Sequence, residues 1–172
     1  MALYALGEQE PSIHPDAFVH PDAVVIGSVT IGADSSVWPT AVLRGDDGTI
    51  SVGERTSIQD GAIIHTTKEQ ATFIGSDCTI GHLVHMEGCT IEDGSLIGSA
   101  SVVLHRAVVG PRSLVAANAV VLNDMIVPPG AVALGVPAKI REDAADPDEL
   151  LDSAVSYVAR ARRFRAELRR LD

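Results

Sequence analysis

Aliphatic residues recur every six positions through most of this chain. The position four residues after each aliphatic is small or β-branched, and glycine often follows the aliphatic directly. A helix period of about 3.6 or a strand period of 2 gives no six-residue beat, but a solenoid of short strands with regular corners does. The aliphatic positions are Val19, Val25, Ile31 and Val37, then Ile74, Ile80 and Met86, then Ile91, Ile97, Val103, Val109, Val115 and Val121. The pattern predicts an all-β solenoid of about six to seven coils with three strands in each, rather than a β-sandwich with irregular strand lengths.

The six-residue beat slips at two places in the first half of the chain. Three extra residues enter before Val52, within residues 44–48, and four more enter between Ile64 and Ile74, within residues 65–70. Insertions in a solenoid become loops on one face, and that face is often the one that binds or reacts. The insertions therefore direct the search for functional side chains to this part of the chain.

The repeat fades after Val132, and the sequence then predicts a helix. Asp146 is placed to cap its N-terminus, with Pro147 at the first helical position and Glu149 closing an arrangement like a capping box. Its apolar residues, alternately four and three positions apart, are Leu150, Ala154, Tyr157, Ala161, Phe164, Leu168 and Leu171. We expect residues 1–143 to form the solenoid domain and residues 144–172 to form a helix packed on the coil or on a neighbouring subunit.

Composition narrows the class of protein. The 172 residues are 46% apolar but only 3% aromatic, which suits a narrow prism filled by Val and Ile. The net charge is −10, although six of the eleven arginines lie in residues 160–170. An acidic coil argues against binding to nucleic acid or to an anionic membrane. With no apolar run near the roughly 20 residues that span a bilayer, we expect a soluble, cytoplasmic protein.

Stacking the coils in register places polar residues in columns. Arg44, His65 and Glu87 fall on successive rungs of one face, about 4.8 Å apart as in any parallel strand pairing. On the preceding face, Asp60 stacks on His82. Cys78 and Cys89 sit at different phases of the repeat and are interpreted as core fillers rather than as a metal pair or a disulfide.

His82 lies too far from the stacked pair of His65 and Glu87 for one chain to bind a metal ion through all of them. Five extended residues separate His82 from Glu87, which corresponds to roughly 15 Å before the corner shortens it, whereas a zinc ligand lies about 2.0–2.2 Å from the ion. Prisms packed about a three-fold axis would bring the His82 face of one chain against the His65 face of the next. The repeat geometry thus predicts a homotrimer with three interfacial sites.

Five segments spread over nearly the whole chain read VLRGD at 42–46, IQDGAIIH at 58–65, TIGH at 79–82, GCTI at 88–91 and GVPAK at 135–139. Together they resemble the γ-class carbonic anhydrases. The resemblance implies a left-handed parallel β-helix, a homotrimer, and a zinc or iron ion held by three histidines from two subunits, with cobalt also compatible. It also implies a lyase that hydrates CO₂ reversibly to bicarbonate through a metal-bound hydroxide.

Carried over by resemblance, His65 matches the first metal ligand and His82 the second, donated by the neighbouring subunit. Glu87 stands where the family usually has its third histidine. Three alternatives stay open: Glu87 completes a His₂Glu site, His85 compensates as ligand, or Glu87 merely pairs with Arg44 and no metal binds. A carboxylate ligand adds negative charge, so we expect weaker activity at neutral pH than a three-histidine site would have.

The resemblance also assigns supporting roles. It implies that Gln59 orients the hydroxide, that Arg44 and Asp46 form an interfacial salt bridge, and that Asp60 holds a ligand or an arginine in place. The alternative for Arg44, Asp46 and Asp60 is that they only stabilise the trimer. The remaining candidates are weaker: Glu69 as a proton shuttle, Tyr157 near the site or in the core, His14 and His20 as surface residues, and His105 beyond the ladder with no site role.

Two other classes of function remain. A trimeric metal-binding or scaffold protein without turnover is favoured by Glu87. A hexapeptide-repeat acyltransferase using acetyl-CoA would need an acceptor pocket, which is usually built by inserted loops longer than the three and four residues found here.

Overall fold

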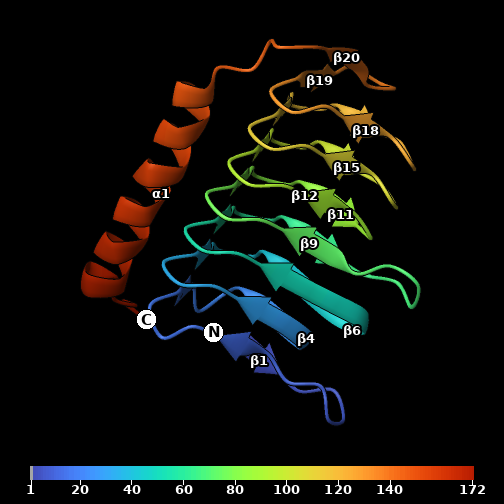
Figure 1. Cartoon of the computed structure of the whole chain (residues 1–172). Helices are drawn as coiled ribbons and strands as arrows, with labels where there is room; N and C mark the ends of the chain where they lie inside the picture. The colour runs from blue at the N-terminus through green and yellow to red at the C-terminus, as the bar shows by residue number, and fades with distance from the viewer. Residues whose placement is uncertain (1) are drawn as a thin grey trace.

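The computed structural model describes residues 2–172 and shows a parallel β-solenoid flanked by one helix (Figure 1). The strands are β1 (Ala2–Tyr4), β2 (Ser12–Ile13), β3 (Phe18–Val19), β4 (Val24–Ile31), β5 (Ser36–Val37), β6 (Val42–Val52), β7 (Ser57–Ile58), β8 (Ile63–His65), β9 (Thr72–Ile74), β10 (Thr79–Ile80), β11 (His85–Glu87), β12 (Thr90–Ile91), β13 (Leu96–Ile97), β14 (Val102–Val103), β15 (Val108–Val109), β16 (Leu114–Val115), β17 (Val120–Val121), β18 (Ile126–Val127), β19 (Val132–Leu134) and β20 (Lys139–Arg141). The helix, α1, spans Pro147–Glu167.

Three columns of strands form the faces of a prism. The first face stacks β1, the start of β4, the start of β6, β8, β11, β14 and β17, and the second stacks β2, the ends of β4 and β6, β9, β12, β15 and β18. The third face stacks β3, β5, β7, β10, β13, β16 and β19, and β20 is added antiparallel to β19. These seven stacked strands confirm the predicted solenoid of about six to seven coils.

The six-residue beat is confirmed as the core. Each repeat aliphatic from Val25 to Val121 points into the prism and is fully or almost fully buried, together with the small residues that follow at the fourth position, such as Ala62 and Ala107. Cys78 and Cys89 lie in the same core, and burial raises the pKa of both thiols to about 12. Both cysteines therefore act as core fillers, as predicted.

The corners between faces are tight and recur with the repeat. Many of them place a non-glycine residue in the left-handed region, for example Leu83 with φ +60° and Ala100 with φ +57°. A side chain in this region costs on the order of 1 kcal/mol, and the ladder hydrogen bonds on both sides hold it there. The corner at Leu83 separates the candidate ligands, because His82 lies at the end of the third face and His85–Glu87 on the first face.

Both insertions lie where the beat predicts them. The register of β4 with β6 is Gly27 to Gly45 and then Val29 to Ile50, so three extra residues bulge from β6. A Cβ on Gly45 would lie 2.6 Å from the carbonyl oxygen of Ser28, so the close approach of the coils at this bend requires glycine. The four-residue insertion forms the loop between β8 and β9, where Glu69 is exposed.

Helix α1 packs against the third face of its own chain, on β3, β5, β7 and β10. The side chain of Asp146 accepts hydrogen bonds from the backbone N–H groups of Asp148 and Glu149, which confirms the predicted cap. Phe18, Trp38, Tyr157 and Phe164 meet edge to face or tilted, with ring centroids 5.0–6.2 Å apart. We call these four residues the aromatic seam.

The predicted apolar stripe of the helix is too long at its C-terminal end. The helix stops at Glu167, Leu168 forms its C-cap, and Leu171 is 83% exposed. The residues after Glu167 lie beside residues 20–22 of the first coil, where the side chain of Leu171 stays exposed. Tyr157 packs on Trp38, which matches the core role rather than a place near the metal ligands.

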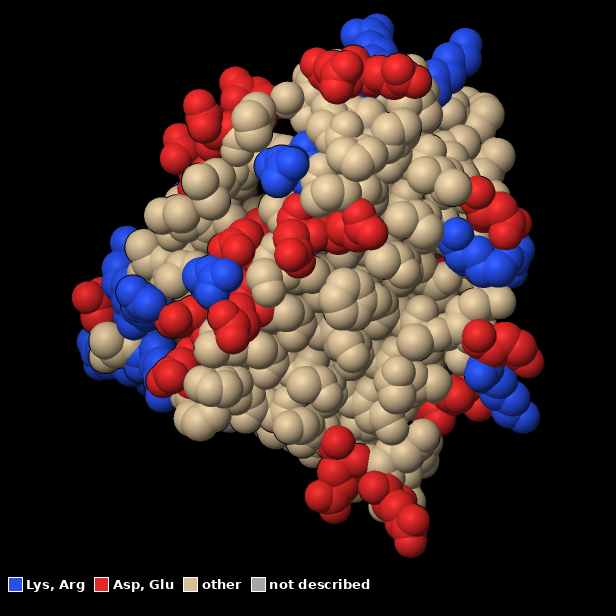
Figure 2. Space-filling model, viewed as in Figure 1, with Lys and Arg blue, Asp and Glu red and all other residues tan. Residues whose placement is uncertain are grey.

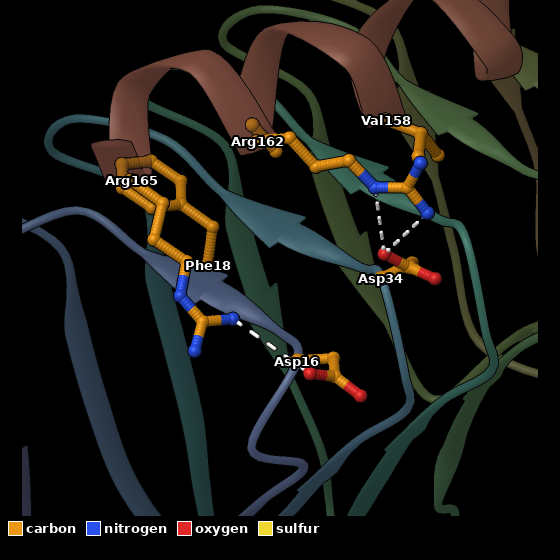
Figure 3. Close-up of a pocket in the computed structure, with 7 residues that line it drawn as sticks. Asp16, Phe18, Asp34, Val158, Arg162 and Arg165 are labelled. Atoms are coloured by element: carbon orange, nitrogen blue, oxygen red, sulfur yellow. Dashed lines mark hydrogen bonds and ion pairs between the residues drawn. The ribbon is translucent and has the colours of Figure 1, made fainter. Parts of the chain in front are cut away.

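Six of the eleven arginines lie in residues 160–170, in the last turns of α1 and just beyond its end, and Figure 2 shows a group of basic side chains at one end of the molecule. Arg162 pairs with Asp34 at 3.0 Å and Arg165 with Asp16 at 4.0 Å, across a cavity of about 300 Å³ between helix and coil (Figure 3). Within residues 2–172, α1 is the sole helix, and it lacks the long apolar stretch that a membrane crossing requires.

Candidate metal centre

The predicted ladder on the first face is confirmed residue by residue. Arg44 on β6 stands opposite His65 on β8, and His65 stands opposite Glu87 on β11. On the third face Ile58 pairs with Ile80, and two residues further along each strand Asp60 Oδ2 lies 3.0 Å from Nδ1 of His82. Sequence spacing therefore placed both histidines and their neighbours correctly.

His65 is held between two carboxylates. Its Nδ1 lies 3.0 Å from Oε1 of Glu87, and its Nε2 lies 3.0 Å from Oδ1 of Asp46. Ionised carboxylates only accept hydrogen bonds, so a ring nitrogen that carries a proton donates it to the carboxylate beside it. The side chain is 18% exposed, which leaves its outer edge open to solvent.

Asp46 reaches His65 because of the insertion in β6. Its Oδ2 accepts a hydrogen bond from the Arg44 guanidinium of the same chain. The expected place of this salt bridge at a subunit interface stays a prediction. Burial raises the pKa of Asp46, but hydrogen bonds from His65, from its own backbone and from Arg44 outweigh it, so the pKa lies below its usual value. Asp46 is thus an anion at neutral pH.

Glu87 is surrounded by imidazoles rather than by arginine. Besides His65, its Oε2 lies 3.4 Å from Nε2 of His105 and 3.8 Å from Nε2 of His85. Burial raises the pKa of Glu87, but hydrogen bonds from His105 and His65 outweigh this effect, so the pKa lies below its usual value. Glu87 is therefore also ionised at neutral pH. The alternative in which Glu87 pairs with Arg44 is wrong, since Arg44 pairs with Asp46 instead.

His105 is the residue that sequence reasoning missed. It follows Leu104, which continues the ladder column, and the corner at Arg106, with φ +59°, turns the chain just after it. The imidazole of His105 comes back over Gly88, whose Cβ would lie 3.5 Å from it, to meet Glu87. The absence of a side chain at Gly88 was the available signal, because it leaves room for a neighbouring coil to reach in.

His82 lies apart from this cluster, on the third face. Its side chain is 48% exposed, Nδ1 is paired with Asp60, and no other residue of the described chain pairs with Nε2. The neighbouring Gln59 is buried. Within residues 2–172, no three His, Cys, Asp or Glu side chains lie close enough to hold a metal ion.

Comparison with known proteins gives the family. Residues 10–45 and 88–123 match the model of the bacterial transferase hexapeptide (six repeats). The carnitine operon protein CaiE of Escherichia coli is 39% identical over 87% of this chain and 76% of its own length. The chain belongs to the hexapeptide-repeat family.

Other hexapeptide-repeat proteins extend this result. Gamma carbonic anhydrase 1, mitochondrial, of Arabidopsis thaliana is 39% identical over 93% of this chain, and the match spans 61% of that protein's length. A hexapeptide transferase family protein from Anaplasma phagocytophilum superposes with a TM-score of 0.91 at 36% identity, over 95% of this chain and 98% of that one. The resemblance to γ carbonic anhydrases therefore holds at the level of the sequence.

Proposed function

We propose that this hexapeptide-repeat protein is a γ-carbonic-anhydrase-like metalloprotein that hydrates CO₂ reversibly at the interfaces of a homotrimer. The observation that carries the proposal is the pair of imidazoles of His65, partly buried, and His82, exposed, which stand on adjacent faces and each lie against at least one carboxylate. The likeness to a protein named gamma carbonic anhydrase supports the same reaction.

The donor chemistry of these residues fits a divalent metal. Imidazole nitrogens and carboxylate oxygens are ordinary zinc ligands, and iron or cobalt accept the same set. One chain supplies too few ligands at either histidine, so a second chain must supply the missing imidazole. Exposed apolar side chains flank both positions, Ile63 beside His65 and Leu83 beside His82, as expected of faces that pack on another subunit.

The residues of this chain would divide the work as follows. His65 and His82 hold the ion, together with a carboxylate of the first face. The chemistry that the bound ion supplies is acidification of water, whose pKa falls from 15.7 towards about 7. Asp60 holds the ring of His82 by its Nδ1 edge, so that Nε2 faces outward. Gln59, buried beside Asp60, would orient the attacking water, and Arg44, paired with Asp46, would keep the entrance polar.

A non-catalytic metal-binding trimer is the second candidate. It is favoured by the negative charge of the first face, where Asp46 and Glu87 are both ionised beside His65. Negative charge next to the ion raises the pKa of the acidified water. Turnover at neutral pH would then be lower than at a site with three neutral imidazoles.

Subunit complementation tests the proposed function directly. His65→Ala and His82→Ala trimers should each lose CO₂ hydration by more than about 100-fold in stopped-flow assays of zinc- or cobalt-loaded protein. Unfolding and refolding the two together should restore about a quarter of the wild-type activity, because one interface in four then joins an intact His65 to an intact His82. His14→Ala, at an exposed histidine of the first coil, is the matched control and should remain fully active.

The outcomes separate the candidates. A metal-loaded trimer that does not hydrate CO₂ would support the non-catalytic metal-binding function and contradict the proposed enzyme. A monomer in multi-angle light scattering, or activity that survives both alanine variants, would remove the interfacial site altogether. Thiol release from acetyl-CoA would instead point to an acyltransferase.

A further inference from the structure

Asp46 and Glu87 compete for the role of carboxylate ligand, and the geometry of His65 separates them. They contact opposite edges of the ring, Asp46 at Nε2 and Glu87 at Nδ1. An imidazole that binds a metal ion through one nitrogen directs the other away from it. Only one of the two carboxylates can therefore share a metal ion with His65.

The Nδ1 edge is already filled. Glu87 there meets His65 through Oε1, while its Oε2 faces His105 at 3.4 Å and His85 at 3.8 Å. Although four potential ligands gather on this side, no three of them are arranged so that they could hold an ion within the described residues. The cluster is therefore a set of mutual contacts that fixes Glu87 against His65.

The Nε2 edge offers two ligands and a place for a third. Oδ1 of Asp46 lies 3.0 Å from Nε2, and Oδ2 is occupied by Arg44, so that Oδ1 is the free oxygen once the Nε2 proton has left. Two ligands of one tetrahedral zinc ion are roughly 3.3–3.6 Å apart. A shift of a few tenths of an ångström would let the two atoms share an ion.

His82 shows the same arrangement on the third face. Its Nδ1 edge lies against Asp60 at 3.0 Å and its Nε2 edge is open. Metal-binding histidines usually donate their second ring N–H to a carboxylate, which sets the tautomer and the ring orientation. Glu87 and Asp60 thus have the same place, each at the Nδ1 edge of its imidazole, Glu87 beside His65 and Asp60 beside His82.

We propose that Asp46, and not Glu87, is the carboxylate ligand of the metal ion. The other two ligands are Nε2 of His65 and Nε2 of His82 from the neighbouring subunit. Glu87, held by His105, is a positioning residue for His65. The assignment rests on the interfacial site proposed above. It explains how a chain with glutamate in the place of the family's third histidine keeps a complete set of ligands. The site becomes a His₂Asp centre with a carboxylate behind each imidazole.

Metal affinity of the full-length trimer tests this assignment without any assay of activity. Zinc is titrated against a chromophoric chelator, and cobalt binding is followed by its visible absorption. Asp46→Asn should lower the affinity by more than about 100-fold, beyond the 10–100-fold range of outer residues. Glu87→Gln, whose amide oxygen still accepts from Nδ1, should keep the metal affinity within about 10-fold of the wild type and leave the cobalt spectrum unchanged. Glu87→Ala and His105→Ala should lower the affinity, but by less than Asp46→Asn does.

The matched control is Asp47→Asn, which removes one charge from the same insertion at an exposed residue and should leave affinity unchanged. A larger loss with Glu87→Gln than with Asp46→Asn, or a changed cobalt spectrum in Glu87→Gln, would overturn the assignment. So would wild-type trimer that binds no metal. A trimer that binds metal in the expected order of affinities but does not hydrate CO₂ would uphold the ligand set and refute only the proposed reaction.

Discussion

The aromatic seam and the polar ladder are built from the same repeat but on different physical terms. The seam residues are buried or half-buried and meet within one chain, where rings from β3, from the residue after β5 and from α1 cover one another. The polar ladder and its two neighbours Asp46 and His105 are partly exposed and ionisable, and they meet across neighbouring coils. The seam is thus placed to stabilise a single chain, whereas the ladder carries the side chains of the proposed interfacial site.

Replacing Trp38 with alanine should give the largest effect and should divide the two regions cleanly. Trp38 is 5% exposed, contacts three aromatic rings, and donates its indole N–H to the hydroxyls of Ser36 and Ser57. We expect Trp38→Ala to lower the free energy of unfolding by about 3–5 kcal/mol, measured by urea denaturation. Zinc affinity per folded trimer should not change.

Trp38→Phe is the matched variant, since it keeps most of the ring contact and removes only the N–H donor. Trp38→Phe should lower the free energy of unfolding clearly less than Trp38→Ala does. A loss below about 1 kcal/mol for Trp38→Ala, or a parallel loss of zinc affinity, would contradict the division between the seam and the ladder.

Acid should act on the ladder and spare the seam. The pKa values of Asp46 and Glu87 lie below their usual values, so these groups stabilise the folded chain above the pKa of the unfolded state. That contribution is lost as the pH falls through the folded pKa values, below about pH 4. In this acid range we expect the free energy of unfolding of the zinc-free protein to fall by less than the loss that Trp38→Ala causes at neutral pH.

The double variant Asp46→Asn/Glu87→Gln checks the origin of this acid sensitivity. Its urea midpoint should fall less between pH 6 and pH 3 than that of the wild type. An identical fall in both proteins would assign the acid sensitivity to other carboxylates of the chain.

The fold could be predicted almost completely from the sequence, because a buried aliphatic every six residues admits few architectures. The register followed from counting inserted residues, so His65 opposite Glu87 and Asp60 beside His82 were predictable. His105 was not, since its side chain reaches a neighbouring rung over Gly88 rather than along its own column. Asp46 likewise reaches His65 from within a bulge, where the repeat gives no position for a side chain.

The cap of helix α1 should have a medium effect on the seam. Asp146 accepts hydrogen bonds from two backbone N–H groups at the start of the helix that covers Trp38. Asp146→Ala should lower the free energy of unfolding by about 1 kcal/mol, while Asp146→Asn, which still caps, should cost much less. Trp38 fluorescence during urea denaturation reports whether α1 leaves the coil before the solenoid unfolds, and equal costs for the two variants would show that the cap contributes little.

The smallest effect is expected where charges join helix and coil at the surface. Arg162 donates to Asp34 beside the seam (Figure 3), but the arginine side chain is 68% exposed. An exposed ion pair contributes about 0.2–1 kcal/mol and is screened by salt. A double-mutant cycle with Arg162→Ala and Asp34→Ala should give a coupling free energy in this range that declines in 1 M NaCl. A coupling well above that range would mean that the helix is held by its charges as much as by its rings, and the contrast between seam and ladder would then fail at the seam.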